Sequence, residues 1–135
     1  MSMSFIRLLQ TAALSGLIGA GAATAETWEV VDLGDVDIVG PPLVVFGPDG
    51  LLAVDTGCNR LVGGAATEGN ALKIGGPMAA TKMACPEDLA RQEDALLRLF
   101  SGAVEFTFDP FSSTLMLSAN GIAASLKPAA DTSED

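Results

Sequence analysis

The chain contains no histidine and no tyrosine, and only 7 of its 135 residues are lysine or arginine. Histidine is the commonest general base, and it is also a frequent ligand of transition metals. With 17 acidic residues the formal net charge is −10, which leaves no cationic surface for DNA, RNA or anionic lipid. We therefore expect neither a histidine-dependent hydrolase nor a nucleic-acid-binding protein, and we expect no cofactor.

The first 25 residues differ from the rest of the chain. Arg7 precedes an apolar stretch rich in alanine and glycine, which ends in Ala23-Thr24-Ala25. This order of features is typical of a secretory signal peptide that is cleaved after Ala25. An uncleaved membrane anchor is the alternative, but polar residues dilute the stretch. We expect residues 1–25 to be a leader and the protein to be periplasmic or secreted, with no stable membrane anchor after cleavage.

The two cysteines, Cys58 and Cys85, are 27 positions apart. In an oxidising compartment such a pair is more often a structural disulfide than a catalytic thiol. A redox-active pair is the alternative, although thiol oxidoreductases usually keep their cysteines two residues apart at a helix start. A zinc site would need more ligands than two cysteines supply. We expect a structural disulfide, no metal site and no catalytic residue.

Short apolar runs alternate with turn sequences through most of the remaining chain. The pairs Asp49-Gly50, Gly69-Asn70 and Asn120-Gly121 favour positive φ angles, which suit two-residue hairpin turns between antiparallel strands. Val104, Phe106 and Phe108 alternate with polar residues, which is typical of a strand with one buried face. These features predict an antiparallel sheet.

One segment breaks this β pattern. Pro86 followed by two acidic residues is typical of a helix start, and Gly102 is typical of a helix end. We expect a helix of about fourteen residues whose apolar face covers the concave side of a curved sheet. The residues of that expected face are Leu89, Leu96, Leu97 and Phe100.

A series of motifs follows along the same part of the chain. They are Thr56-Gly57-Cys58-Asn59-Arg60, Gly63, Leu72-Lys73-Ile74-Gly75, Thr81-Lys82-Met83-Ala84-Cys85-Pro86 and Gln92-Glu93. In this order they resemble the META domain family, which includes the heat-shock protein HslJ. The family pairs a Gly-Cys-Asn turn with a Met-Ala-Cys segment before a helix, and Trp28 fits its N-terminal strand.

The resemblance implies an α+β fold, in which an antiparallel, partly barrel-like β-sheet wraps around a single α-helix. It also implies an exported or envelope domain that is not an enzyme. We expect residues 26–128 to form this META/HslJ-like domain and residues 129–135 to be a disordered acidic tail, because the tail has no apolar anchor.

Several motif residues have a structural and a functional interpretation. Asp55 and Asn59 resemble a catalytic pair, but asparagine at a tight turn more often bonds neighbouring backbone groups and adopts the left-handed conformation. Met83 is a candidate partner contact, but we expect Thr81–Ala84 to be a strand whose methionine packs against the helix. For both segments we favour the structural role.

Two further features lie near the start of the expected domain. Trp28, the only tryptophan, is expected to plug one end of the core, with an exposed interface anchor as the alternative. Asp32, Asp35 and Asp37 suggest a calcium site, but apolar residues interrupt any calcium loop. We expect these aspartates to form a solvated acidic edge of the sheet.

The leader, the cysteine pair and the lack of a catalytic set together favour a binding function. We expect a monomeric, exported, non-enzymatic domain that acts in envelope maintenance or stress tolerance by binding an apolar ligand or a peptide strand. The alternative is a docking or inhibitor module that contacts an envelope protein through an exposed loop from Arg60 to Gly64. A thiol-based redox enzyme is a third possibility.

Overall fold

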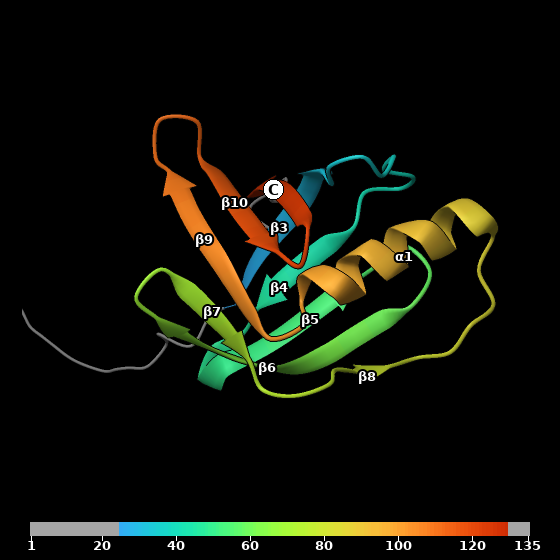
Figure 1. Cartoon of the computed structure of the whole chain (residues 1–135), viewed down its shortest axis with the longest axis horizontal. Coiled ribbons are helices and arrows are strands. Elements are labelled where there is room, and N and C mark those ends of the chain that lie inside the picture. Colours follow the sequence, from blue (N-terminus) through green and yellow to red (C-terminus); the bar gives the residue numbers. More distant parts are fainter. Residues whose placement is uncertain (1–24, 130–135) are drawn as a thin grey trace, which may run out of the picture.

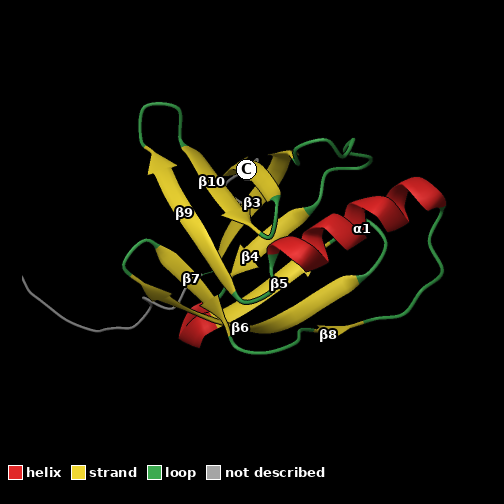
Figure 2. Ribbon diagram, viewed as in Figure 1, coloured by secondary structure: helices red, strands yellow, loops and turns green. Residues whose placement is uncertain are grey.

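The fold is described from a computed structural model, which covers residues 25–129. The predicted leader up to Thr24 and the predicted tail after Ala129 lie outside the described residues. Within them, α1 (Glu87–Leu99) is the only α-helix, and the other, short red segment of Figure 2 is the 3₁₀ turn Pro48–Gly50. Neither has the length and hydropathy of a membrane-spanning helix. The strands are β3 (Glu26–Asp32), β4 (Leu43–Phe46), β5 (Leu51–Asp55), β6 (Arg60–Glu68), β7 (Ala71–Ile74), β8 (Ala79–Ala80), β9 (Ala103–Asp109), β10 (Thr114–Ala119) and β11 (Ile122–Pro128).

The strands form a closed antiparallel barrel. Their order is β5-β4-β3-β11-β10-β9-β7-β6, and β5 also pairs with β6, which closes the circuit. The two-residue strand β8 pairs with Leu61 and Val62 of β6, beside the place where β7 pairs with the second half of that strand. Closure leaves few unpaired strand edges. The predicted fold class, an α+β protein with a barrel-like antiparallel sheet and one helix, is confirmed.

The three predicted turn pairs each connect two paired strands. Asn120-Gly121 joins β10 to β11 with φ angles of 52° and 80°, as a two-residue hairpin turn requires. Gly69-Asn70 joins β6 to β7, with a φ of 62° at Gly69. Asp49-Gly50 joins β4 to β5, but the connection is longer than two residues because it includes a 3₁₀ turn, Pro48–Gly50.

Helix α1 closes one end of the barrel (Figure 1). The β3–β4, β5–β6 and β10–β11 connections lie at this end, and side chains bond the helix to all three of them. The Asn120 amide, for example, donates to the carbonyls of Arg98 and Ser101 at 2.8 and 2.9 Å. The opposite end holds the β4–β5, β6–β7 and β9–β10 turns, and its one helical element within the described residues is the 3₁₀ turn Pro48–Gly50.

The buried face of α1 differs in part from the predicted one. Leu96 and Phe100 are buried as expected, but Leu89 is half-buried and Leu97 is 39% exposed. The remaining buried residues of the helix are Gln92, Ala95 and Leu99. The prediction failed at Leu97 because the buried face runs through Gln92, Ala95, Leu96 and Leu99, and Leu97 lies beside this face.

Burial decreases along β9 from the closed end towards the open end. Val104 is fully buried, Phe106 is half-buried and Phe108 is 48% exposed, although all three share the inner face of the strand. On the inner face of β3, burial also decreases towards the open end: Val30 is buried, and Trp28, which lies nearer the open end, is half-buried. The core is therefore filled near the helix and less filled at the open end.

Candidate functional site

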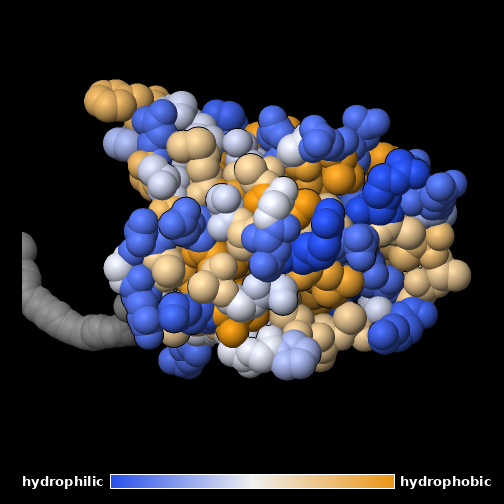
Figure 3. All heavy atoms as spheres, viewed as in Figure 1, coloured by the Kyte–Doolittle hydropathy of each residue, from blue (hydrophilic) through white to orange (hydrophobic). Residues whose placement is uncertain are grey.

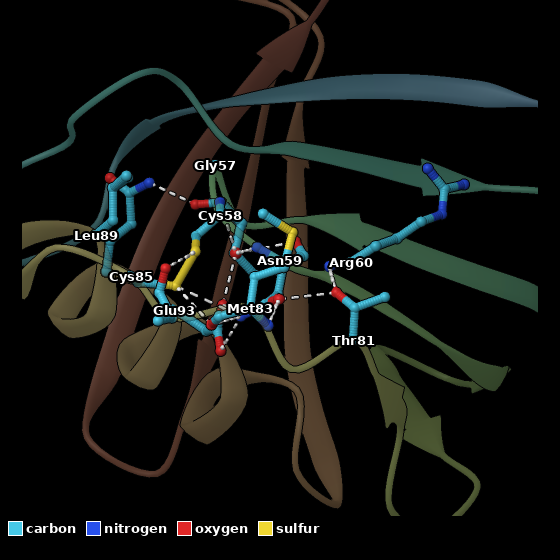
Figure 4. Close-up of a disulfide and its surroundings, with 12 residues drawn as sticks. Gly57, Cys58, Asn59, Arg60, Thr81, Met83, Cys85, Leu89 and Glu93 are labelled. Carbon is cyan, nitrogen blue, oxygen red and sulfur yellow. Dashed lines mark hydrogen bonds between the residues drawn. A yellow bond between two sulfur atoms is a disulfide. The ribbon is translucent and has the colours of Figure 1, made fainter.

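A disulfide joins Cys58 to Cys85 at the closed end of the barrel (Figure 4). The Cα atoms are 6.0 Å apart, and the bond connects the β5–β6 turn to the segment that leads into α1. No cysteine of the described chain is free. The cysteine pairing expected from the sequence is present.

Around the disulfide lies a polar cluster, made of Thr56, Asn59, Thr81, Gln92 and Glu93. Its centre is Asn59, which is only 5% exposed. The Asn59 Oδ1 atom accepts hydrogen bonds from Thr81 Oγ1 at 2.8 Å and from Met83 N at 2.7 Å. Its Nδ2 donates to Glu93 Oε1 at 3.0 Å. One buried amide thus joins the β5–β6 turn, the segment before α1, and α1 itself.

The Asn59 side chain makes the kind of hydrogen bonds expected of a structural residue, but its partners differ from the prediction. Its side chain bonds groups more than twenty positions away in sequence, not its neighbours. The left-handed conformation of the turn belongs to Gly57, whose φ is 98°. A Cβ atom on Gly57 would lie 3.0 Å from Leu89 Cδ2 and 3.1 Å from Gln92 Nε2, so the helix approaches this turn too closely for a side chain.

Two polar residues of α1, Gln92 and Glu93, hold the β5–β6 turn from the helix side. Gln92 is fully buried, donates from Nε2 to the carbonyl of Thr56 at 2.7 Å and accepts from Val39 N at 2.7 Å. Glu93 accepts from Thr56 Oγ1 at 2.9 Å. Buried polar groups that pair fully in this way fix one arrangement of the surrounding backbone.

The two cysteines and Glu93 of the cluster form the one group of possible metal ligands among the described residues. The side-chain ligand atoms of Cys58, Cys85 and Glu93 lie within 4.8 Å of one another. The two sulfur atoms are bonded to each other, however, and a disulfide does not supply the thiolates that bind metals. Asp55, the other residue considered for catalysis, accepts from Gly57 N at 3.0 Å and so supports the turn.

Two predictions about neighbouring segments are wrong. Thr81–Ala84 is not a strand, and the Met83 side chain is 63% exposed; Asn59 binds the Met83 backbone instead. Residues Arg60–Gly64 do not form a loop, because they are the first part of β6 and pair with β5. Within this strand, a Cβ atom on Gly63 would lie 3.1 Å from Met78 Cγ, so glycine leaves room for the β7–β8 connection.

The acidic residues near the end of β3 are all exposed. Asp32, Asp35 and Asp37 face solvent, and Asp32 Oδ1 accepts from Gly34 N at 2.9 Å within its own turn. Figure 3 shows hydrophilic side chains over much of one face of the molecule, with apolar patches between them. The three aspartates are solvated, as predicted, but they form no edge of the sheet, because β3 pairs with both β4 and β11 and Asp35 and Asp37 lie in the β3–β4 connection.

A second candidate site lies at the open end of the barrel. It is a hollow of about 340 Å³, close to the lower limit of the usual size of small-molecule sites. Its lining comes from six strands: Glu26 and Trp28 of β3, Phe46 of β4, Thr67 of β6, Leu72 of β7, Phe106 and Phe108 of β9, and Leu115 and Leu117 of β10. Most of these side chains are aliphatic or aromatic, so the hollow is apolar.

Trp28 lies at one end of the core, as predicted. It does not plug that end, however, because its side chain lines the open hollow. Its ring lies edge-on to Phe108, with the centroids 6.1 Å apart and the planes at 81°. Sequence reasoning missed the hollow as a site. The available signal was the group of aromatic residues, Trp28, Phe46, Phe106 and Phe108, at inward positions of β3, β4 and β9.

The barrel with one helical cap and a disulfide beside it defines a class of small α+β domains. The META domain family matches residues 22–131, and the chain belongs to this family. The resemblance found in the sequence motifs is confirmed.

Solved structures agree with this fold. One protein determined by NMR has a TM-score of 0.65 at 18% identity, covering 77% of this chain and 89% of its own. A second NMR structure, of a protein from Burkholderia xenovorans, has a TM-score of 0.63 at 16% identity, covering 78% of this chain and 83% of its own. No curated protein matches the sequence. At these identities the likeness concerns the fold alone.

Proposed function

We propose that this protein is an exported, non-enzymatic META domain that binds an apolar small molecule at the open end of its barrel. Through this binding it would act in envelope maintenance or stress tolerance. The observation that carries the proposal is the hollow of about 340 Å³, which is lined by Leu, Phe and Trp side chains. Removing the apolar surface of a ligand and of these side chains from water supplies the binding free energy.

The division of the barrel into two ends supports this proposal. At the closed end the polar groups bond one another, the two cysteines form a disulfide, and Leu96 and Leu99 fill the interior. At the open end the lining side chains Trp28 and Phe106 are half-buried, and Glu26 and Thr67 are the lining residues with a carboxylate or hydroxyl group. The closed end therefore supports the fold, and the open end is the place for a ligand.

Two observations favour export. The Cys58–Cys85 disulfide is of a kind that persists mainly in oxidising compartments. The first 25 residues have the order of features of a secretory leader. N-terminal sequencing of the protein from the periplasmic or secreted fraction tests this part of the proposal, and the expected first residue is Glu26. Recovery of the uncleaved chain from the cytosol with titratable thiols would contradict it.

Ligand binding is tested with N-phenyl-1-naphthylamine, whose fluorescence rises in an apolar environment. Thr67 lines the hollow, whereas Ala66 precedes it in β6 and points to the other face of the sheet. We expect Thr67→Phe to fill part of the hollow and to weaken probe binding about tenfold, while the matched control Ala66→Phe binds as the wild type does. Equal binding by the two variants, or no binding by the wild type, would refute the proposed site.

Native mass spectrometry of protein purified from its own host gives an independent test. We expect an apolar adduct of defined mass that is absent from the Thr67→Phe variant and present in Ala66→Phe. An adduct retained equally by both variants would place the ligand elsewhere.

A further inference from the structure

The aromatic residues of this protein are unevenly distributed. The whole chain has 6 Phe and 1 Trp, and the hollow is lined by Trp28, Phe46, Phe106 and Phe108. They come from β3, β4 and β9, so the barrel gathers onto one site residues that are as much as eighty positions apart. An aliphatic lining would suffice to hold a neutral apolar ligand. The concentration of π faces indicates a more specific chemistry.

One charged residue accompanies these rings. Glu26 is the only charged residue in the lining of the hollow, and Trp28 Nε1 lies 3.4 Å from Glu26 Oε1. This hydrogen bond holds a carboxylate next to the indole that forms one wall. A carboxylate beside aromatic faces attracts a positive charge, because the ring faces are the negative ends of their quadrupoles.

We propose that the hollow selects an organic cation, in which an alkylated ammonium group lies against the aromatic faces and beside Glu26. This inference rests on the proposed function above and narrows its ligand class. Alkyl groups on the nitrogen suit the apolar lining, and a quaternary nitrogen needs no hydrogen-bond acceptors, of which the lining offers few. The net charge of −10 favours the approach of a cation over that of an anion.

The inference is tested with two probes of the same shape. Choline carries a trimethylammonium group, and 3,3-dimethyl-1-butanol has a carbon atom in place of the nitrogen and no charge. Trp28 is the only tryptophan of the chain and lines the hollow, so its fluorescence reports binding directly. Cleavage after Ala25 would leave an α-amino group on Glu26. The titrations are therefore run at constant ionic strength and at pH 9, where this amino group is mostly uncharged.

A pair of variants separates the local carboxylate from the general charge of the protein. Glu26 and Glu29 both belong to β3, but only Glu26 lies on the strand face that lines the hollow. Glu26→Gln and the control Glu29→Gln each remove one negative charge and keep the size of the side chain. Amide NMR spectra with each probe identify the strands whose resonances shift.

We expect choline to bind about tenfold more tightly than its neutral analogue. Glu26→Gln should weaken choline about three- to fivefold and leave the alcohol unchanged, while Glu29→Gln should affect neither. Equal binding of both probes in the hollow would refute the cation inference and leave the apolar site intact. Absence of shifts at the hollow with either probe or with N-phenyl-1-naphthylamine would refute the inference and the proposed function together. If Glu26→Gln and Glu29→Gln weakened choline binding equally, the net charge of the protein would explain the loss, and the inference would also be refuted.

Discussion

Replacement of Asn59 by aspartate tests whether the polar cluster holds the closed end together. The two side chains have the same shape, so the bonds that Oδ1 accepts from Thr81 and from Met83 N can remain. The exchange replaces the Nδ2 donor, which lies 3.0 Å from Glu93 Oε1, by an oxygen atom. It therefore removes a hydrogen bond to a charged group and places two carboxylates in contact at a buried position.

The magnitude follows from these two changes. A hydrogen bond to a charged partner contributes about 1.5–3 kcal/mol. Two unit charges about 3 Å apart at an effective dielectric constant of about 20 repel by up to about 5 kcal/mol. Because Glu93 is half-buried and can turn towards water, part of this repulsion is relieved. We expect Asn59→Asp to lower the free energy of unfolding by about 3–5 kcal/mol, a large share of the about 5–15 kcal/mol typical of a domain.

The assay is urea unfolding at neutral pH with the disulfide intact, and a double variant sharpens it. In Asn59→Asp/Glu93→Gln the donor and acceptor exchange places, so we expect about 2 kcal/mol of the loss to return. The exposed Asn70 provides a control, since Asn70→Asp should change stability by less than about 0.5 kcal/mol. A loss below 1 kcal/mol for Asn59→Asp, or no recovery in the double variant, would refute the role assigned to this amide.

Three further stability predictions use the same unfolding assay. Reduction of the Cys58–Cys85 bond should cost about 3–4 kcal/mol, and an unchanged urea midpoint in reductant would contradict this. Leu96→Ala should lower the free energy of unfolding by about 2–5 kcal/mol, because Leu96 is fully buried. Leu97→Ala, on the exposed side of α1, should lower it far less, and similar losses for the two variants would mean that the buried face of the helix is wrongly assigned. Gly57→Ala should cost more than about 1 kcal/mol, because its φ is 98° and the new Cβ meets α1; a neutral result would show that the turn relaxes freely.

The secondary structure was largely predictable because its signals are local. Asn120-Gly121 specifies a hairpin turn by its own backbone preferences, and Pro86 marks the start of α1 by its missing amide proton. The connection at Asp49-Gly50 was harder, since the preceding Pro48 adds a 3₁₀ turn that the two-residue pattern does not contain. Local rules thus placed the strands and the helix, with errors at their connections.

The interactions of the polar cluster were less predictable. The sequence identified Asn59 as structural but not its partners, because Thr81 and Glu93 reach it only after β6 and α1 have docked. The burial of Gln92 was missed for the same reason: a polar residue on an apolar face is favourable only when its bonds to Val39 and Thr56 exist. Met83 was misplaced because its backbone, not its side chain, makes the contact.

The sequence by itself determined the family, the antiparallel strands, the single helix and the two cysteines available for a bridge, because each depends on residues close together in the chain or on a motif in a given order. Only the tertiary structure decided that α1 closes one end of the barrel and that the other end is an aromatic hollow beside Glu26. The physical reason is closure: pairing of β5 with β6 sets the register around the whole barrel, and this register decides which inward side chains share an end.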